Sequence, residues 1–157
     1  MAYTGKEIST FIKGVEDEQI QPAGVDLKLD KVFRFLNNGF LGKNKRILPE
    51  FEEILPTNDV YLLSKGSYKI RFYDIVEIPK EAIGICFPRS SLLRMGASIN
   101  CALWDPGYIG RGEALLNVIN DNGVKIERYA RIAQITFIKL RNEPEKTYKG
   151  IYNNENL

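Results

Sequence analysis

Two groups of side chains that could do chemistry lie within one central stretch of the sequence. The first runs from Pro88 to Leu92, reads Pro-Arg-Ser-Ser-Leu, and is followed three residues after its second serine by Arg94. A guanidinium, adjacent hydroxyls and backbone amides freed at a turn are the groups that hold phosphate oxygens in proteins. The cluster therefore suggests a polyphosphate site. A second interpretation remains open, in which Ser90 or Ser91 caps a short helix and Arg94 is solvated.

The second group runs from Trp104 to Tyr108 and reads Trp-Asp-Pro-Gly-Tyr. The Pro-Gly pair is typical of a tight turn. Two interpretations of the turn remain open. In the first, Asp105 caps the turn and Tyr108 packs against its neighbours. In the second, Asp105 is a positioned general base and Tyr108 is an aromatic floor for a ring. Trp104 is expected in the core.

The composition limits what this chemistry can be. None of the 157 residues is histidine, which removes Ser-His triads, imidazole bases and most zinc sites. The net charge of +2 is too small to indicate a nucleic-acid partner. No apolar run approaches the ~18 residues of a membrane span, so we expect no membrane partner and a cytoplasmic location (host cytoplasm for a viral protein). Cys86 and Cys101 lack metal-site spacing and are expected to be buried free thiols.

Short elements of mostly β type must position these groups. Thr4 and Glu7 have the spacing of a capping box, and the apolar residues that follow predict one helix over residues 5–13. Residues 25–30 alternate between apolar and polar types, which predicts a strand with Asp26 on its exposed face. Residues 37–45 are expected to form an exposed loop.

Further short apolar or alternating runs complete the pattern. Strands are predicted at residues 68–73, 82–87, 124–127 and 132–140. The Asp-Asn-Gly sequence at residues 121–123 predicts a hairpin turn. Many short strands with frequent turns and one helix favour a single all-β domain over residues 1–157, as a sandwich or barrel.

Four segments of the chain, taken in order, resemble the motifs of the dUTPase / dCTP deaminase superfamily. They are Pro22–Leu27, Pro88–Leu92, Asp105–Gly110 and Arg131–Gln134. The resemblance covers nearly the whole chain and is strongest to the archaeal or viral branch, with deaminase-like N-terminal and tail segments. It implies a distorted jelly-roll (β-clip) fold and a homotrimer with active sites at the subunit interfaces. It also implies dUTP as substrate and Mg²⁺ bound to the triphosphate.

The same resemblance assigns roles position by position. Residues that would hold the phosphates are Arg89, Ser90, Ser91, Arg94 and Gln134. Asp26 would act in the water shell of the metal or in the architecture of the site, and no side chain would bind the metal directly.

For the nucleoside, the resemblance makes Asp105 the base that activates water and places Tyr108 against the deoxyribose. Backbone groups near residues 99–102 would read uracil, together with the amide of Asn100. The predicted activity is that of a dUTP diphosphatase, which releases dUMP and pyrophosphate.

Two alternatives stay open. The glutamate of the deaminases aligns with Asn117, whose amide cannot shuttle protons. Glu113 lies four residues earlier, two before the place where the family pattern expects the glutamate. Because a two-residue slip keeps strand parity, a dCTP deaminase or a bifunctional enzyme remains an alternative. A non-catalytic nucleotide-binding module is the alternative from another class.

The C-terminal residues 141–157 lose the strand pattern and are expected to form a flexible tail. The segment from Tyr148 to Tyr152 is similar to the aromatic tail of deaminase-like members. It would either close over the nucleotide as a lid, with Tyr152 stacking on the ligand, or remain a disordered terminus.

Overall fold

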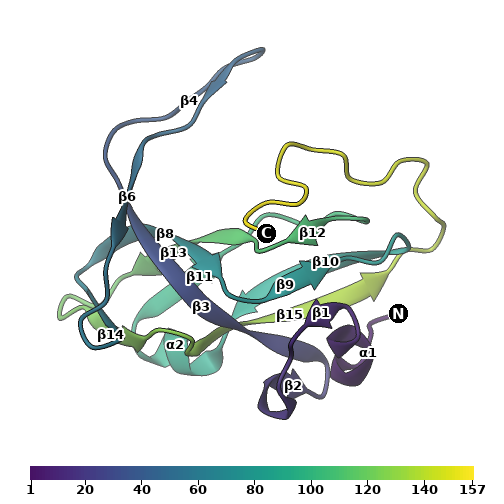
Figure 1. Cartoon of the computed structure of the whole chain (residues 1–157), viewed down its shortest axis with the longest axis horizontal. Helices are drawn as coiled ribbons and strands as arrows, with labels where there is room; N and C mark the ends of the chain where they lie inside the picture. The colour runs from purple at the N-terminus through teal and green to yellow at the C-terminus, as the bar shows by residue number, and fades with distance from the viewer.

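The structure is a computed structural model that describes residues 1–157, and it is built almost entirely of strands (Figure 1). Its helical elements are α1 (Gly5–Ser9), the 3₁₀ turn η1 (Asp17–Gln19) and α2 (Ser90–Arg94). The predicted all-β class is confirmed. None of these helices is long and apolar enough to span a bilayer.

Fifteen strands make up the rest of the fold. They are β1 (Ile12–Lys13), β2 (Ile20–Gln21), β3 (Gly24–Phe35), β4 (Phe40–Leu41), β5 (Arg46–Ile47), β6 (Phe51–Ile54), β7 (Val60–Leu63), β8 (Gly66–Phe72), β9 (Ile75–Glu77), β10 (Ala82–Pro88), β11 (Ala97–Asn100), β12 (Ile109–Gly110), β13 (Glu113–Val118), β14 (Val124–Glu127) and β15 (Arg131–Lys139). The main sheet has the order β10-β15-β3-β8-β13-β11.

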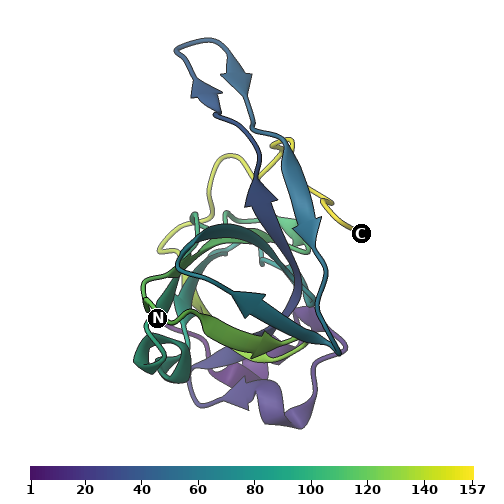
Figure 2. The ribbon, with the colours of Figure 1, turned by 90° about the vertical axis from the view of Figure 1, so that its left-hand side faces the viewer.

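Strand β3 organises the sheet because it is long and apolar at every second position. Val25, Leu27 and Leu29 are fully buried, and β3 pairs with β15 along one part of its length and with β8 along another. The two ends of the sheet meet where Gly84 and Trp104 exchange hydrogen bonds of 2.9 and 3.1 Å. The sheet therefore curls into a barrel around the core, as Figure 2 shows. Trp104 lies in that core, as predicted.

The first helix is shorter than predicted. The capping box of Thr4 and Glu7 is present, but α1 ends at Ser9 and not at residue 13. The chain then becomes extended because Ile12 pairs with Val76 of β9. Ile12 is buried in this strand pairing.

Two other expectations hold only in part. Residues 37–45 contain β4 and, with β5, form an arm that projects from the barrel (Figures 1 and 2). The arm leaves Phe40 55% and Leu41 86% exposed. The turn at residues 121–123 exists, but it joins β13, which pairs with β8 and β11, to β14, which pairs with β7. It is therefore not a hairpin.

Candidate active site

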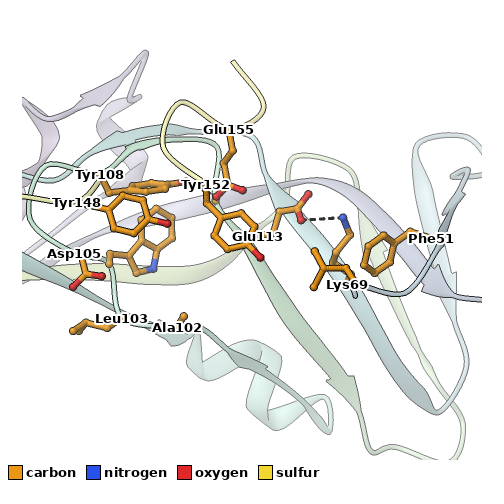
Figure 3. A pocket seen from close by; sticks show the side chains of 13 residues that line it. Phe51, Lys69, Ala102, Leu103, Asp105, Tyr108, Glu113, Tyr148, Tyr152 and Glu155 are labelled. Atoms are coloured by element: carbon orange, nitrogen blue, oxygen red, sulfur yellow. Dashed lines mark hydrogen bonds and ion pairs between the residues drawn. The ribbon is translucent and has the colours of Figure 1, made fainter. Parts of the chain in front are cut away.

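One cavity of about 330 Å³ lies at the rim of the barrel, and Asp105 and Tyr108 both line it (Figure 3). Its other walls come from residues 102–104, from Glu113 at the start of β13, and from the C-terminal tail. The size suits a small organic ligand. Asp105 and Tyr108, which belong to the same tight turn, therefore face the same cavity.

The turn holds Tyr108 in a fixed position. Gly107 adopts a φ of +83°, and its N–H donates to the carbonyl of Ile78 at 3.0 Å. The Tyr108 ring is buried and meets Trp104 edge-on at 5.2 Å between ring centroids. The Tyr108 hydroxyl donates to Oε1 of Glu155 at 2.8 Å. Burial, followed by that hydrogen bond, raises the pKa of Tyr108 well above its ordinary value, so the ring is a neutral, rigid wall.

The carboxylate of Asp105 has no hydrogen-bond or ion-pair partner within the chain, although the side chain is partly buried beside the cavity. The turn closes through the backbone, since Tyr108 N–H donates to the Asp105 carbonyl at 3.1 Å. The capping role considered for this side chain is therefore not observed. An unengaged carboxylate at the edge of a cavity can accept a proton from water.

The Arg-Ser-Ser cluster forms the start of α2. Arg89 occupies the N-cap position without a capping side-chain bond, so neither Ser90 nor Ser91 is the cap. Both serines are exposed and so is Arg94, while Leu92 is buried and anchors the helix to the core. The hydroxyls and the Arg94 guanidinium are thus free to meet a ligand.

Asp26 differs most from its expected position. It is fully buried, not solvated, and its carboxylate meets three side chains. Arg89 Nε lies 3.1 Å and Arg131 Nη1 3.6 Å from Oδ2, and Gln134 Nε2 donates to Oδ1 at 3.2 Å. Asp26 therefore joins Arg89, the residue between β10 and α2, to Gln134 of β15. A buried carboxylate requires such partners.

Arg131 opens one of the four family-like segments, but no role in the site was predicted for it from the sequence. Residues 131 and 134 are an odd number apart and would point to opposite faces of a regular strand. The pairing of β15 with β3 shifts register between Arg131 and Ala133. A bulge of this kind re-aims side chains, and it lets both Arg131 and Gln134 reach Asp26. The alternation of side chains along a regular strand therefore does not predict that Arg131 and Gln134 both reach Asp26.

The expected site residues fall into two separate groups within one chain. None of the five proposed phosphate-binding residues lines the cavity that contains Asp105 and Tyr108. This cavity alone therefore cannot bring Asp105 and the predicted phosphate-binding residues onto one nucleotide.

Glu113, at the far wall of the cavity, is held by two cations. Its carboxylate accepts from Lys69 Nζ at 2.9 Å and from Arg71 Nη2 at 3.1 Å, and the first of these contacts is visible in Figure 3. Lys69 in turn lies 4.0 Å from the centre of the Phe51 ring. Both oxygens of this carboxylate are thus engaged by Lys69 and Arg71.

The tail lies over the cavity in a defined conformation. Glu155 forms a parallel bridge with Gly110 of β12, and Asn154 N–H donates to the Ile109 carbonyl at 2.8 Å. Tyr148 and Tyr152 both line the cavity. The docked tail therefore adds a wall that carries Glu155 close to Tyr108.

Docking of the tail should depend on pH through Glu155. Burial is the main cause that raises its pKa above the ordinary value of 4.5; Glu113 also raises it, while the Tyr108 hydrogen bond and the cations Arg71 and Lys69 oppose the shift. A raised pKa means that the docked state binds more protons, so docking is favoured below about 4.5 and weakens as the pH rises through the docked pKa. Hydrogen exchange of the Glu155 and Asn154 amides between pH 4 and 7, corrected for intrinsic rates, measures this. Glu155→Gln should remove the trend, and an unchanged trend in that variant would assign it to another group.

Comparisons with known proteins agree with this geometry. A family described as dCTP deaminase-like matches residues 3–140. The chain is 44% identical to the probable deoxyuridine 5'-triphosphate nucleotidohydrolase of Aeropyrum pernix, over 93% of this chain and 92% of that protein. It is 42% identical to the deoxyuridine 5'-triphosphate nucleotidohydrolase of Methanocaldococcus jannaschii, over 90% and 92%.

Solved structures show the same fold at low identity. The 2'-deoxycytidine 5'-triphosphate deaminase of Agrobacterium tumefaciens matches with a TM-score of 0.67 at 19% identity, over 87% of this chain and 47% of that one. The dUTPase of Staphylococcus bacteriophage 80alpha matches with a TM-score of 0.51 at 14% identity, over 88% and 95%.

Proposed function

The chain belongs to the dCTP deaminase-like family, and we infer its reaction from the two relatives described above. It is a dUTP diphosphatase, which hydrolyses dUTP to dUMP and pyrophosphate. The observation that carries this conclusion is the identity of 42–44% to dUTP nucleotidohydrolases over at least 90% of the chain. The direct test is incubation with dUTP, which should release dUMP and pyrophosphate in equal amounts.

Asp105 is the group that we assign to the chemical step. Its carboxylate is unpaired at the cavity edge, where it can orient a water and accept its proton during in-line attack on the α-phosphorus. Tyr108, held by its turn, would support the deoxyribose. Because such a rigid wall leaves little room, it would disfavour a 2'-hydroxyl.

The phosphates would be held by the residues around α2. Ser90, Ser91 and Arg94 are exposed and free of other partners. Arg89 and Gln134 are held in place by the buried carboxylate of Asp26. We propose that Asp26 contributes to the site by holding Arg89 and Gln134 in position.

The residues present fit Mg²⁺ that is carried by the triphosphate. Asp26 is already engaged by Arg89, Arg131 and Gln134, which favours a metal held by the phosphates over one held by this carboxylate. Mg²⁺ is commonly bound through substrate phosphates in such enzymes. When bound there it would neutralise charge that develops on the phosphates.

The deaminase alternative lacks its essential group. Asn117 carries an amide, and the Glu113 carboxylate is fixed by Lys69 and Arg71. The binding-module alternative does not explain an unengaged carboxylate at Asp105.

The tail is proposed to serve as the lid of this site. It already contacts the cavity through Tyr148 and Tyr152, and it is tied to β12 by backbone hydrogen bonds. Ordering over bound nucleotide would exclude water. Tyr152 is 37% exposed, so its ring is available to stack on a ligand.

We propose that the active unit is a homotrimer in which each site uses two chains. The separation of the Asp105 cavity from the phosphate cluster within one chain supports this. Mixing Asp105→Asn and Arg94→Ala proteins, each of low activity, should restore turnover, because some mixed sites receive both intact groups. Each variant alone, at the same total concentration and under the same exchange conditions, is the control. A mixture that stays inactive after demonstrated subunit exchange would contradict shared sites.

A further inference from the structure

Three side chains on the outer face of the barrel wall form a hydrogen-bonded chain. Ser67 lies on β8, Asn117 on β13 and Asn100 at the end of β11. Ser67 Oγ donates to Asn117 Oδ1 at 2.7 Å, and Asn117 Nδ2 donates to Asn100 Oδ1 at 2.7 Å. The pairing register places Asn117 directly opposite Ser67, so the chain follows from the fold.

This chain determines which end of the Asn100 amide is available. An asparagine side chain has an acceptor end and a donor end. In the structure the acceptor end of Asn117 faces the Ser67 hydroxyl, and the Asn117 NH₂ group occupies the acceptor of Asn100. The exposed end of Asn100 is therefore the NH₂ group, which donates.

Asn100 lies where a base could reach it. A shallow depression lined by Asn100, Lys69 and Glu113 adjoins the main cavity, and the last two residues line both spaces. Figure 3 shows Lys69 and Glu113 at the end of the cavity away from Asp105. A nucleoside whose sugar lies against Tyr108 can extend its base along this groove.

We propose that Asn117 is a positioning residue that makes the site selective for a 4-oxo pyrimidine over a 4-amino pyrimidine. This inference rests on the proposed function. By holding the Asn100 NH₂ toward the base, Asn117 offers a donor to the carbonyl oxygen at C4 of uracil. Cytosine has an amino group at that position, so two donors would face each other and both would lose a partner.

Asn117→Asp tests the proposal with almost no change in shape. An aspartate has no donor, so one oxygen accepts from Ser67 and the other accepts from the Asn100 NH₂, which turns the amide around. The ratio of dUMP to dCMP affinity, measured by calorimetry on the full chain, is expected to fall about 10- to 100-fold. Asn122→Asp is the matched control, because Asn122 lies in the exposed turn after β13 and outside this chain.

A second variant guards against a folding defect. Ser67→Ala removes the group that fixes Asn117 and should lower the same ratio by a smaller factor, about 3- to 10-fold. A purely structural role would weaken both nucleotides equally. Unchanged ratios in both variants would overturn the proposal. Since these affinities need no turnover, their outcome is separate from a failure to hydrolyse dUTP, which would overturn the proposed function instead.

Discussion

Replacing Asp105 with asparagine is expected to slow dUTP hydrolysis by about 10²- to 10⁴-fold, the usual contribution of a general base. The amide has the same shape but cannot take a proton from water. Because the carboxylate makes no hydrogen bond or ion pair in the chain, folding should be little affected. Affinity for a non-hydrolysable dUTP analogue should also change little, since the lost interaction belongs to the transition state.

Steady-state kinetics and calorimetry with the analogue measure the two quantities separately. Glu127→Gln, at an exposed acid on β14 far from the cavity lining, is the matched control and should leave both unchanged. If the Asp105→Asn enzyme kept wild-type turnover, another group would have to be the base.

Replacing Arg89 with methionine should have the second largest effect, because it acts on both stability and binding. The substitution leaves the buried Asp26 carboxylate with Arg131 at 3.6 Å and Gln134 as its remaining partners. We expect a loss of about 3 kcal/mol in the free energy of unfolding, the lower end for a broken buried pair, since Arg131 still faces the carboxylate. Binding of the triphosphate should weaken about tenfold or more.

A double variant separates the two effects. Adding Asp26→Asn to Arg89→Met removes the uncompensated charge, so stability should partly return while triphosphate affinity does not. Denaturant unfolding and calorimetry provide the measurements. Arg34→Met is the control, because its pair with Glu52 is more than half exposed on both sides and should contribute less than about 1 kcal/mol. An Arg89→Met protein as stable as wild type would contradict this expectation and show that Arg131 and Gln134 suffice as partners of Asp26.

Local patterns predicted the elements that depend on neighbouring residues. The capping box at Thr4, the alternation from Val25 to Leu29 and the turn at Gly107 all depend on a few adjacent side chains. The same kind of reasoning was wrong for Asp26. Alternation assigns one face of a strand to solvent, but here Arg89 and Gln134, distant in sequence, cover that face.

The parts of the site that could be predicted are those whose residues are close together in the sequence. Asp105 and Tyr108 are three residues apart, and they do share a cavity. The approach of Glu155 to Tyr108 could not be predicted, because the tail has no periodicity and docks through backbone bonds to β12. Likewise, the Ser67–Asn117 contact depends on strand register, which is decided by pairing over the whole barrel.

Product analysis with two nucleotides tests the central claim most directly. The purified full chain with Mg²⁺ is given dUTP in one reaction and dCTP in another, and the products are separated by chromatography. The account predicts dUMP and pyrophosphate from dUTP and no deaminated product from dCTP. dUTP or dUMP formed from dCTP would contradict it, because Glu113 or another group would then be carrying protons to the base.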